Sequence, residues 1–139
     1  ERLMADALDG LPIQRALVVH GEPGWDEATP AGEFTLFDVK PCYVTETRRK
    51  SVDYAMERCS PVNLAGGDAG HNARELVRVF TGEDQGPHRD ALLMGTSLVL
   101  EVQGAVSNPA EGVARAAAAI DDGSASRFLD TLRTHFGAA

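Results

Sequence analysis

The sequence has 139 residues, of which 43% are apolar and 24% are charged, and its formal net charge at pH 7 is −8. These values are typical of one soluble globular domain; they disfavour a nucleic-acid-binding protein, which usually has a basic surface, and no apolar run is long enough to span a membrane. The first residues lack the apolar core of a signal peptide, so a cytoplasmic protein is expected.

The first part of the chain predicts a helix, a strand and a loop. Apolar residues at helical spacing predict a helix over residues 1–11, ended by Gly10 and Pro12. The continuous apolar run Arg15–His20 predicts a strand buried on both faces, as in a parallel α/β sheet. Residues 20–30 contain two glycines and two prolines, which predicts a loop. Because ligands of open α/β sheets bind beyond the carboxyl ends of strands, this loop is the first candidate for chemistry.

The next segments predict a hairpin and then helices. Phe34–Val39 and Cys42–Arg48 are rich in β-branched and aromatic residues, so an antiparallel pair at the sheet edge is expected. Residues 49–65 show no regular pattern, and no structure is assigned to them. A helix is predicted to begin at the N-cap Asp68 and to end at Gly82. Its apolar residues are expected on one face: Ala73, Leu76, Val77 and Phe80.

Three more helices are predicted. Pro87–Gly104 is apolar on nearly every side, as expected of a core helix. Asn108 begins a capping-box-like sequence, and its helix is closed by Gly123. That helix has an apolar stripe: Val113, Ala116, Ala117 and Ile120. A last helix begins at Ser124 or Ser126, with four residues expected inward: Phe128, Leu129, Leu132 and Phe136. Since one buried strand cannot form a stable sheet, the chain is expected to be part of a larger protein.

Two adjacent carboxylates are the best candidates for a metal site. Asp26 and Glu27 lie in the loop after the first strand, where both can turn toward one cation. Mg²⁺ typically takes one or two carboxylates together with phosphate oxygens of a substrate. A divalent metal would also neutralise the site enough for an anionic ligand to bind an acidic protein. The alternative is a solvated acidic pair.

Other polar residues allow a chemical and a structural interpretation. His20 is either a base or metal ligand, or a residue that shapes the turn. The glycine-rich residues 66–72 either cradle phosphate or form a tight turn, and Asp68 favours the turn because it competes for the same N–H groups. Three residues either line a cleft or cap helix ends: His71, Asn72 and His88. Three arginines are expected to form ion pairs with Glu75, Asp84 and Asp90 rather than bind phosphate: Arg74, Arg78 and Arg89.

Several of these segments, taken together, resemble one enzyme family. Ala16–Gly21, followed at the same distance by Asp26 and Glu27, is similar to the metal-carboxylate segment of anthranilate phosphoribosyltransferases. The resemblance continues to the C-terminus through further segments: Gly66–Ala69 with Asn72 and Ala73, Arg89–Met94, Glu111–Val113 and Ala119–Gly123. It covers nearly the whole chain, and the His-Gly to Asp-Glu spacing combined with the Gly-Gly-Asp-Ala turn is fairly specific.

The resemblance implies a fold and an activity. Residues 1–139 would be the C-terminal half of a nucleoside phosphorylase/phosphoribosyltransferase-like α/β domain, with a central strand, an edge hairpin and several helices. The family's N-terminal helical domain, which forms its homodimer, and its glycine-rich diphosphate loop are absent from the sequence. The implied reaction transfers phosphoribose from phosphoribosyl pyrophosphate to anthranilate in tryptophan biosynthesis. Asp26 and Glu27 would hold Mg²⁺, and His20 and Gly21 are the candidate substrate-binding residues.

Departures from the family pattern leave other functions open. Pro23, Trp25 and Ala28 replace the residues usual in the family. They are compatible with a paralogue that has another acceptor, or with a non-catalytic branch that binds nucleic acid, although the net charge of −8 disfavours nucleic acid. A third possibility is a fragment that is inactive on its own.

Overall fold

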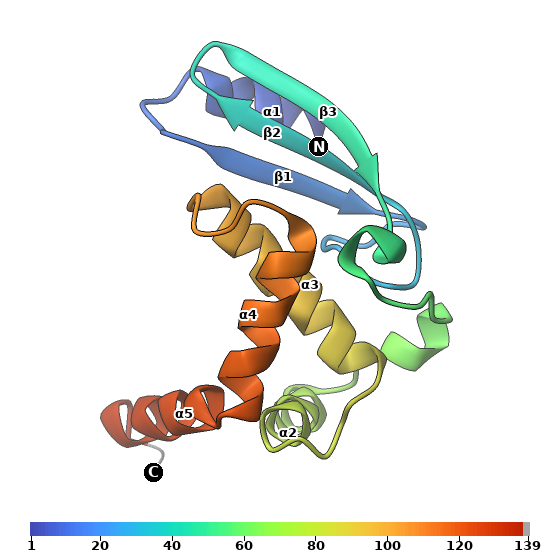
Figure 1. Cartoon of the computed structure of the whole chain (residues 1–139), viewed down its shortest axis with the longest axis vertical. Helices are drawn as coiled ribbons and strands as arrows, with labels where there is room; N and C mark the ends of the chain where they lie inside the picture. The colour runs from blue at the N-terminus through green and yellow to red at the C-terminus, as the bar shows by residue number, and fades with distance from the viewer. Residues whose placement is uncertain (138–139) are drawn as a thin grey trace.

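The computed structural model describes residues 1–137 and has the mixed α/β architecture expected from the sequence, with helices on both faces of a small sheet (Figure 1). The helices and strands follow in this order: α1 (Arg2–Asp9), β1 (Ala16–Gly21), β2 (Phe34–Lys40), β3 (Tyr43–Arg49), α2 (Ala69–Phe80), α3 (Pro87–Val102), α4 (Pro109–Asp121) and α5 (Ser124–His135). Two short 3-10 helices, η1 (Ser51–Tyr54) and η2 (Pro61–Leu64), lie between β3 and α2. Among residues 1–137, none of the helices has the length and hydropathy of a membrane span.

The strands form an antiparallel sheet in the order β1-β2-β3. Val18 of β1 pairs with Phe37 of β2, which pairs with Glu46 of β3. The β2–β3 hairpin confirms the prediction, but the expected parallel pairing is wrong for the strands in residues 1–137. The connection 22–33 between β1 and β2 contains no helix, so the chain turns back beside β1 instead of crossing over to a parallel position. Within this sheet β2 is central and β1 lies at an edge.

Helices cover both faces of the sheet, as the apolar run of β1 predicted. Successive residues of a strand point to opposite faces, so Leu36 packs toward α3 while its neighbour Phe37 packs toward α1. Met94 of α3 and Ala5 of α1 are fully buried against these two faces. Most side chains of β1 nevertheless remain half-buried, because its outer edge carries no partner strand within the described residues.

The helix α3 is the centre of the helical layer, which confirms its prediction as a core helix. Its buried residues are three apolar ones, Leu93, Met94 and Leu98, and three polar or charged ones, Arg89, Ser97 and Glu101. The predicted caps are also confirmed. The Asp68 carboxylate accepts the His71 N–H at 2.7 Å, and the Asn108 side chain accepts the Glu111 N–H at 3.0 Å. In each case, one of the free N–H groups of a helix start gains a partner.

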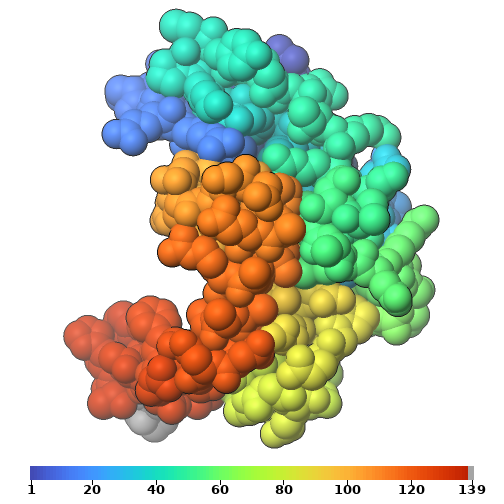
Figure 2. Space-filling model, viewed as in Figure 1, coloured from blue at the N-terminus to red at the C-terminus, as the bar shows by residue number. Residues whose placement is uncertain are grey.

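Two of the predicted apolar faces are wrong. In α2 the buried residue is Val79, whereas Leu76 is 38% exposed. In α5 no residue is fully buried, and Phe128 and Phe136 are 64% and 76% exposed. After the turn at Gly123, whose φ is 78°, the start of α5 contacts α2, where the Ser126 hydroxyl donates to the Phe80 carbonyl at 2.8 Å. Most of the surface of α5 stays uncovered, and Figure 2 shows a hollow beside it. Periodicity identifies residues that share a helix face, but not whether another element covers that face.

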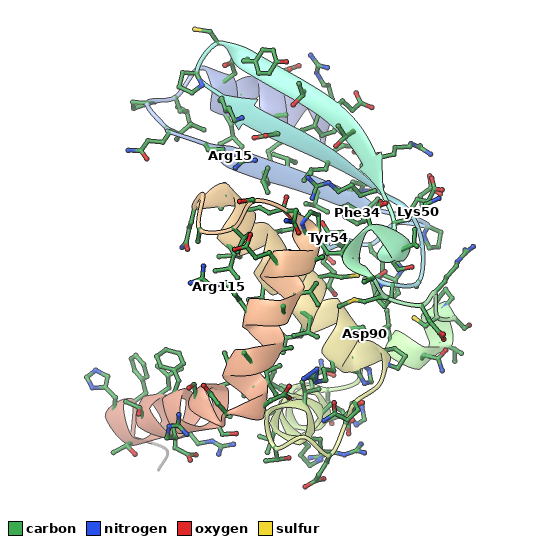
Figure 3. All side chains as sticks on the ribbon, viewed as in Figure 1. Arg15, Phe34, Lys50, Tyr54, Asp90 and Arg115 are labelled. Atoms are coloured by element: carbon green, nitrogen blue, oxygen red, sulfur yellow. The ribbon has the colours of Figure 1, made fainter. Side chains whose placement is uncertain are left out.

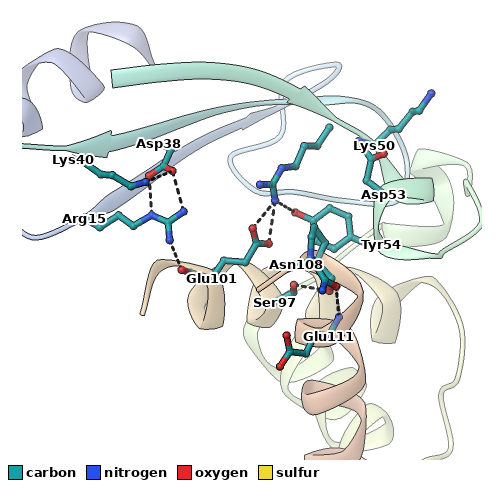
Figure 4. Close-up of polar contacts among 12 residues, drawn as sticks. Arg15, Asp38, Lys40, Lys50, Asp53, Tyr54, Ser97, Glu101, Asn108 and Glu111 are labelled. Carbon is teal, nitrogen blue, oxygen red and sulfur yellow. Dashed lines mark hydrogen bonds and ion pairs between the residues drawn. The ribbon is translucent and has the colours of Figure 1, made fainter. Parts of the chain in front are cut away.

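A polar network joins the sheet to α3 (Figure 4). Glu101 of α3, which is 7% exposed, accepts two hydrogen bonds of 2.9 and 3.0 Å from Arg49 of β3. Arg49 also donates to the hydroxyl of Tyr54 at 3.0 Å. Arg15 donates to both carboxylate oxygens of Asp38 and to the Glu101 carbonyl. Burial raises the pKa of Tyr54 to about 12, although the bond from Arg49 opposes this, so the phenol is neutral at physiological pH.

Candidate functional site

The loop after β1 is closed by its own backbone. The Gly21 N–H donates to the Trp25 carbonyl and the Trp25 N–H donates to the Gly21 carbonyl, both at 2.8 Å. A Cβ atom on Gly21 would lie 2.6 Å from the carbonyl oxygen of Glu27 and 2.9 Å from the Cβ of Trp25. Only glycine leaves room for the chain to pass this close. The crossing returns Asp26 and Glu27 to the carboxyl end of β1.

The other side of the loop is held by a segment further along the chain. Residues 28–31 are buried, and they follow directly after the two acids. The carbonyl oxygens of Pro30 and Ala31 accept hydrogen bonds from the Cys59 N–H and the Arg58 Nε, both at 3.1 Å. The chain between η1 and η2 therefore fixes the base of the loop. The exposed Asp26 and Glu27 precede a buried segment that is held in place.

Asp26, Glu27 and His20 border the same depression beside β1, which has a volume of about 600 Å³. Apolar side chains also line it, among them Leu17, Val19 and Leu98. Glu27 borders in addition a second cavity of about 380 Å³, which lies between α2 and the start of α3. Gly21 is buried and positions the loop through its backbone, so a direct contact of Gly21 with substrate stays a prediction.

The electrostatics of the loop fit a cation. Within residues 1–137, neither the Asp26 nor the Glu27 carboxylate pairs with a lysine or arginine, whereas Glu22 and Glu33 lie 3.3 and 3.7 Å from Arg48. Two adjacent, exposed and unpaired carboxylates supply the oxygen ligands that Mg²⁺ prefers. The remaining ligand positions of such an ion would face the depression, where water or a phosphate can reach them.

The second cavity contains a polar group that the sequence did not identify as a unit. Glu75, Asp84 and His88 offer ligand atoms that lie within 4.8 Å of one another. His71, Asn72 and His88 all border this cavity, so they line a cleft. The second interpretation also holds for two of them, because Asn72 bonds Gly67 and His88 contacts Asp84 at the starts of their helices. The available signal was partial: the spacing of four residues places His71 and Glu75 on one side of α2, but Asp84 lies in the turn before α3, where helical spacing does not apply.

The remaining polar predictions have structural outcomes. In residues 66–72 the side chain of Asn72 accepts the Gly67 N–H at 2.8 Å, so together with the Asp68 cap this is a tight turn and not a phosphate cradle. Arg78 pairs with Glu75 as expected, at 2.9 Å. Arg89 pairs with Asp121 of α4 at 2.6 Å instead of with its neighbour Asp90. Since Arg89 is 8% exposed, it ties α3 to α4 and is not placed to meet a phosphate.

Relatives of this sequence are known. Residues 1–126 match the family described as "Glycosyl transferase family, a/b domain". The chain is 38% identical over 129 residues to an anthranilate phosphoribosyltransferase of Rubrobacter xylanophilus, which covers 93% of this chain and 38% of the relative. It is 37% identical over 130 residues to the one of Desulforudis audaxviator, covering 94% and 37%. The chain thus spans less than two-fifths of the length of these relatives.

Solved structures show the same fold. The anthranilate phosphoribosyltransferase of Thermus thermophilus superposes with a TM-score of 0.82 at 30% identity, over 92% of this chain and 37% of that one. The Saccharomyces cerevisiae enzyme in complex with PRPP and Mg superposes with a TM-score of 0.74 at 27% identity, over 82% and 33%. The resemblance noted in the sequence is therefore confirmed, and the chain belongs to the family described as "Glycosyl transferase family, a/b domain".

Proposed function

We propose that this chain is part of an enzyme that transfers phosphoribose from phosphoribosyl pyrophosphate to anthranilate in tryptophan biosynthesis, and that Asp26 and Glu27 hold its Mg²⁺. The observation that carries the proposal is that both acids and His20 border one depression at the carboxyl end of β1. The names of the relatives support the reaction, and the yeast relative in complex with PRPP and Mg supports the metal and the donor substrate.

The chemistry of the reaction gives these residues their roles. When bound, Mg²⁺ neutralises the diphosphate and makes it a better leaving group. Asp26 and Glu27 would fix the ion at the end of β1 and contribute negative charge near the ribose, whose C1 becomes positive as its bond to the diphosphate oxygen breaks. The anthranilate nitrogen supplies the electron pair for the new bond and then releases a proton to solvent. No protein nucleophile is needed, and His20 is proposed to contact substrate from the wall of the depression.

The outer edge of β1 is proposed to pair with a further strand. Apolar side chains flank this edge on both faces of the sheet, including Met4 and Leu8 from α1 and Leu98 from α3. A free strand edge between apolar surfaces is a template for strand pairing. Residues 1–139 would then be the C-terminal part of a single α/β domain. A structure of a protein that joins this chain to the regions its relatives have should show backbone hydrogen bonds to Ala16–Val19; a solvated edge there would contradict the proposal.

Removing both acids tests the metal site. The double substitution Asp26→Asn with Glu27→Gln should reduce turnover by about 100-fold or more, because loss of a group that merely supports a metal ligand already costs about 10–100-fold. The assay is phosphoribosyl-pyrophosphate-dependent consumption of anthranilate at varied Mg²⁺, in a protein that contains the regions shared by the relatives. In the 139-residue chain, Mn²⁺ used in place of Mg²⁺ should broaden the NMR signals of residues 26 and 27.

A matched control lies in the same part of the chain. Glu22→Gln with Glu33→Gln removes the same charge from two acids whose side chains are 55% and 50% exposed. This control should keep both the activity and the Mn²⁺ effect. Equal loss in both double variants would mean that general charge is responsible, and full activity of Asp26→Asn with Glu27→Gln would remove the basis of the proposal. Mn²⁺ binding without turnover would instead favour a non-catalytic paralogue.

The alternatives have less support. The net charge of −8 opposes binding to nucleic acid. If the diphosphate is held from two sides, the 139-residue chain would supply only one of these sides, so the chain alone is expected to be inactive. The cytoplasmic location and the homodimer stay predictions.

A further inference from the structure

A second group of potential metal ligands lies between α2 and the start of α3, near the labelled Asp90 (Figure 3). It shares no ligand with the pair of Asp26 and Glu27, although Glu27 borders the same cavity. Glu75 comes from the middle of α2, His88 from the first turn of α3, and Asp84 from the turn that joins them. Ligand atoms of all three lie within 4.8 Å of one another, and all three side chains are half-buried. A turn of six residues between two helices therefore brings together two carboxylates and one imidazole, which are ligands suited to transition metals.

The geometry of the closest pair already matches metal coordination. His88 Nδ1 lies 3.2 Å from Oδ2 of Asp84. Two ligands bound at about 2.0–2.2 Å to a tetrahedral ion are separated by roughly 3.4 Å. The other oxygen of Asp84 accepts the Gly86 N–H at 2.8 Å, which fixes the orientation of the carboxylate. An ion at Oδ2 would replace the contact that His88 Nδ1 now makes with this oxygen. Little movement is needed for an ion to lie between the two side chains.

Charge at this place also favours a cation. Glu75, Glu83 and Asp84 contribute three negative charges, and Arg78 is the positive group that contacts Glu75 and Glu83, at 2.9 and 3.7 Å. Arg78 occupies one oxygen of Glu75, so the second oxygen is available.

We propose that Glu75, Asp84 and His88 bind one divalent transition-metal ion of the Zn²⁺ class. The set differs from Asp26 and Glu27 in its nitrogen ligand, which Mg²⁺ avoids and Zn²⁺ accepts. Glu75 and His88 also line the cavity of about 380 Å³, so the fourth position of the ion faces that space. Three protein ligands with an open position can hold a water or an anionic group of a small molecule. His71, one helical turn before Glu75, borders the same cavity.

Titrating the 139-residue chain with Zn²⁺ by calorimetry, and with Co²⁺ by visible absorption, tests the site. One ion should bind per chain at this place, and Co²⁺ should give the intense visible bands of a four-coordinate ion instead of the weak bands of the hydrated one. His88→Ala should weaken Zn²⁺ binding by about 10-fold or more and abolish those bands, since it removes the only nitrogen ligand. Glu75→Gln should weaken binding in the same direction while leaving the Asp84 turn intact.

Control variants distinguish an ion bound at this site from one bound elsewhere on the chain. His135→Ala removes an exposed histidine of α5 and should bind Zn²⁺ as the unmodified chain does. Glu83→Gln removes a neighbouring negative charge but no ligand, so it should weaken Zn²⁺ binding less than Glu75→Gln does. Asp26→Asn with Glu27→Gln should also leave Zn²⁺ binding unchanged, which keeps the test independent of the proposed Mg²⁺ site. Unchanged binding in His88→Ala, with an unchanged circular dichroism spectrum, would overturn the proposal. Loss of Zn²⁺ binding only in the Asp26/Glu27 variant would overturn it as well.

Discussion

Glu101→Ala should lower the free energy of unfolding by about 3–5 kcal/mol, because it leaves the Arg49 guanidinium partly buried without its counter-charge. The side chains of Arg49 and Glu101 are 23% and 9% exposed, so solvent replaces little of the lost interaction. The network in Figure 4 also joins the sheet to α3, so breaking it weakens the contact between them and adds to the loss of stability. Urea denaturation followed by circular dichroism measures the effect. Against a typical total stability of about 5–15 kcal/mol, the variant would be close to unfolding.

Two comparisons show whether the buried charge is the cause. Glu101→Gln keeps the shape of the side chain and a hydrogen-bond acceptor for Arg49, so it should cost less than Glu101→Ala. Asp6→Ala breaks an ion pair with Arg2 whose side chains are 48% and 61% exposed, and it should cost about 1 kcal/mol or less. If Glu101→Ala cost no more than this surface pair, the network would not be what holds α3 to the sheet.

Gly112→Val should destabilise the protein by about 3 kcal/mol, at the upper end of what overpacking usually costs. A Cβ atom on Gly112 would overlap the Oγ of Ser97 and lie 2.8 and 2.9 Å from the Cβ and Cα of Ser97. The last of these is a backbone atom, so a change of rotamer cannot relieve the contact and α4 must move away from α3. The greater conformational restriction of valine offsets only a part of this. Thermal unfolding of the variant and the original protein in parallel gives the measurement.

The control for this prediction is another glycine within a helix. Gly95 lies in α3, and a Cβ atom there would meet no atom within 4 Å. Gly95→Ala should therefore stabilise the protein by about 0.5–1 kcal/mol, since alanine is the better helix former. Opposite signs at the two glycines are expected. A Gly112→Val protein as stable as the original would show that α3 and α4 are not in such close contact.

The parts of the fold that were predictable depend on residues close together in the chain. The caps at Asp68 and Asn108 were predictable because each partner N–H lies three residues away. The β2–β3 hairpin was predictable for a similar reason. The antiparallel direction of β1 was not, because it depends on the path of residues 22–33, which have no repeating pattern. The exposed face of α5 was also unpredictable, since its environment is set by the direction of the turn at Gly123.

In the candidate site, too, the residues that lie close together in the chain were predictable and those that lie far apart were not. Asp26 and Glu27 are adjacent, so any fold that exposes the loop brings them together. Their closeness to His20 followed from the strand that ends there. The group of Glu75, Asp84 and His88 joins two helices across a turn, and no single helical pattern contains all three. Nothing in the sequence indicated that residues 58 and 59 hold the base of the loop. A backbone N–H and an arginine side chain that donate to distant carbonyls produce no periodic pattern along the chain.

The hydrogen bond from Arg58 to the carbonyl of Ala31 spans 27 positions of the chain. Insertion or deletion of a residue within 49–65 would thus move the loop that contains Asp26 and Glu27 without changing either residue. Anyone who grafts the Asp26–Glu27 loop onto another scaffold would have to transplant that irregular segment with it. Conversely, a library of variants restricted to residues 50–60 offers a way to tune the ion-binding geometry while the ligands themselves stay constant.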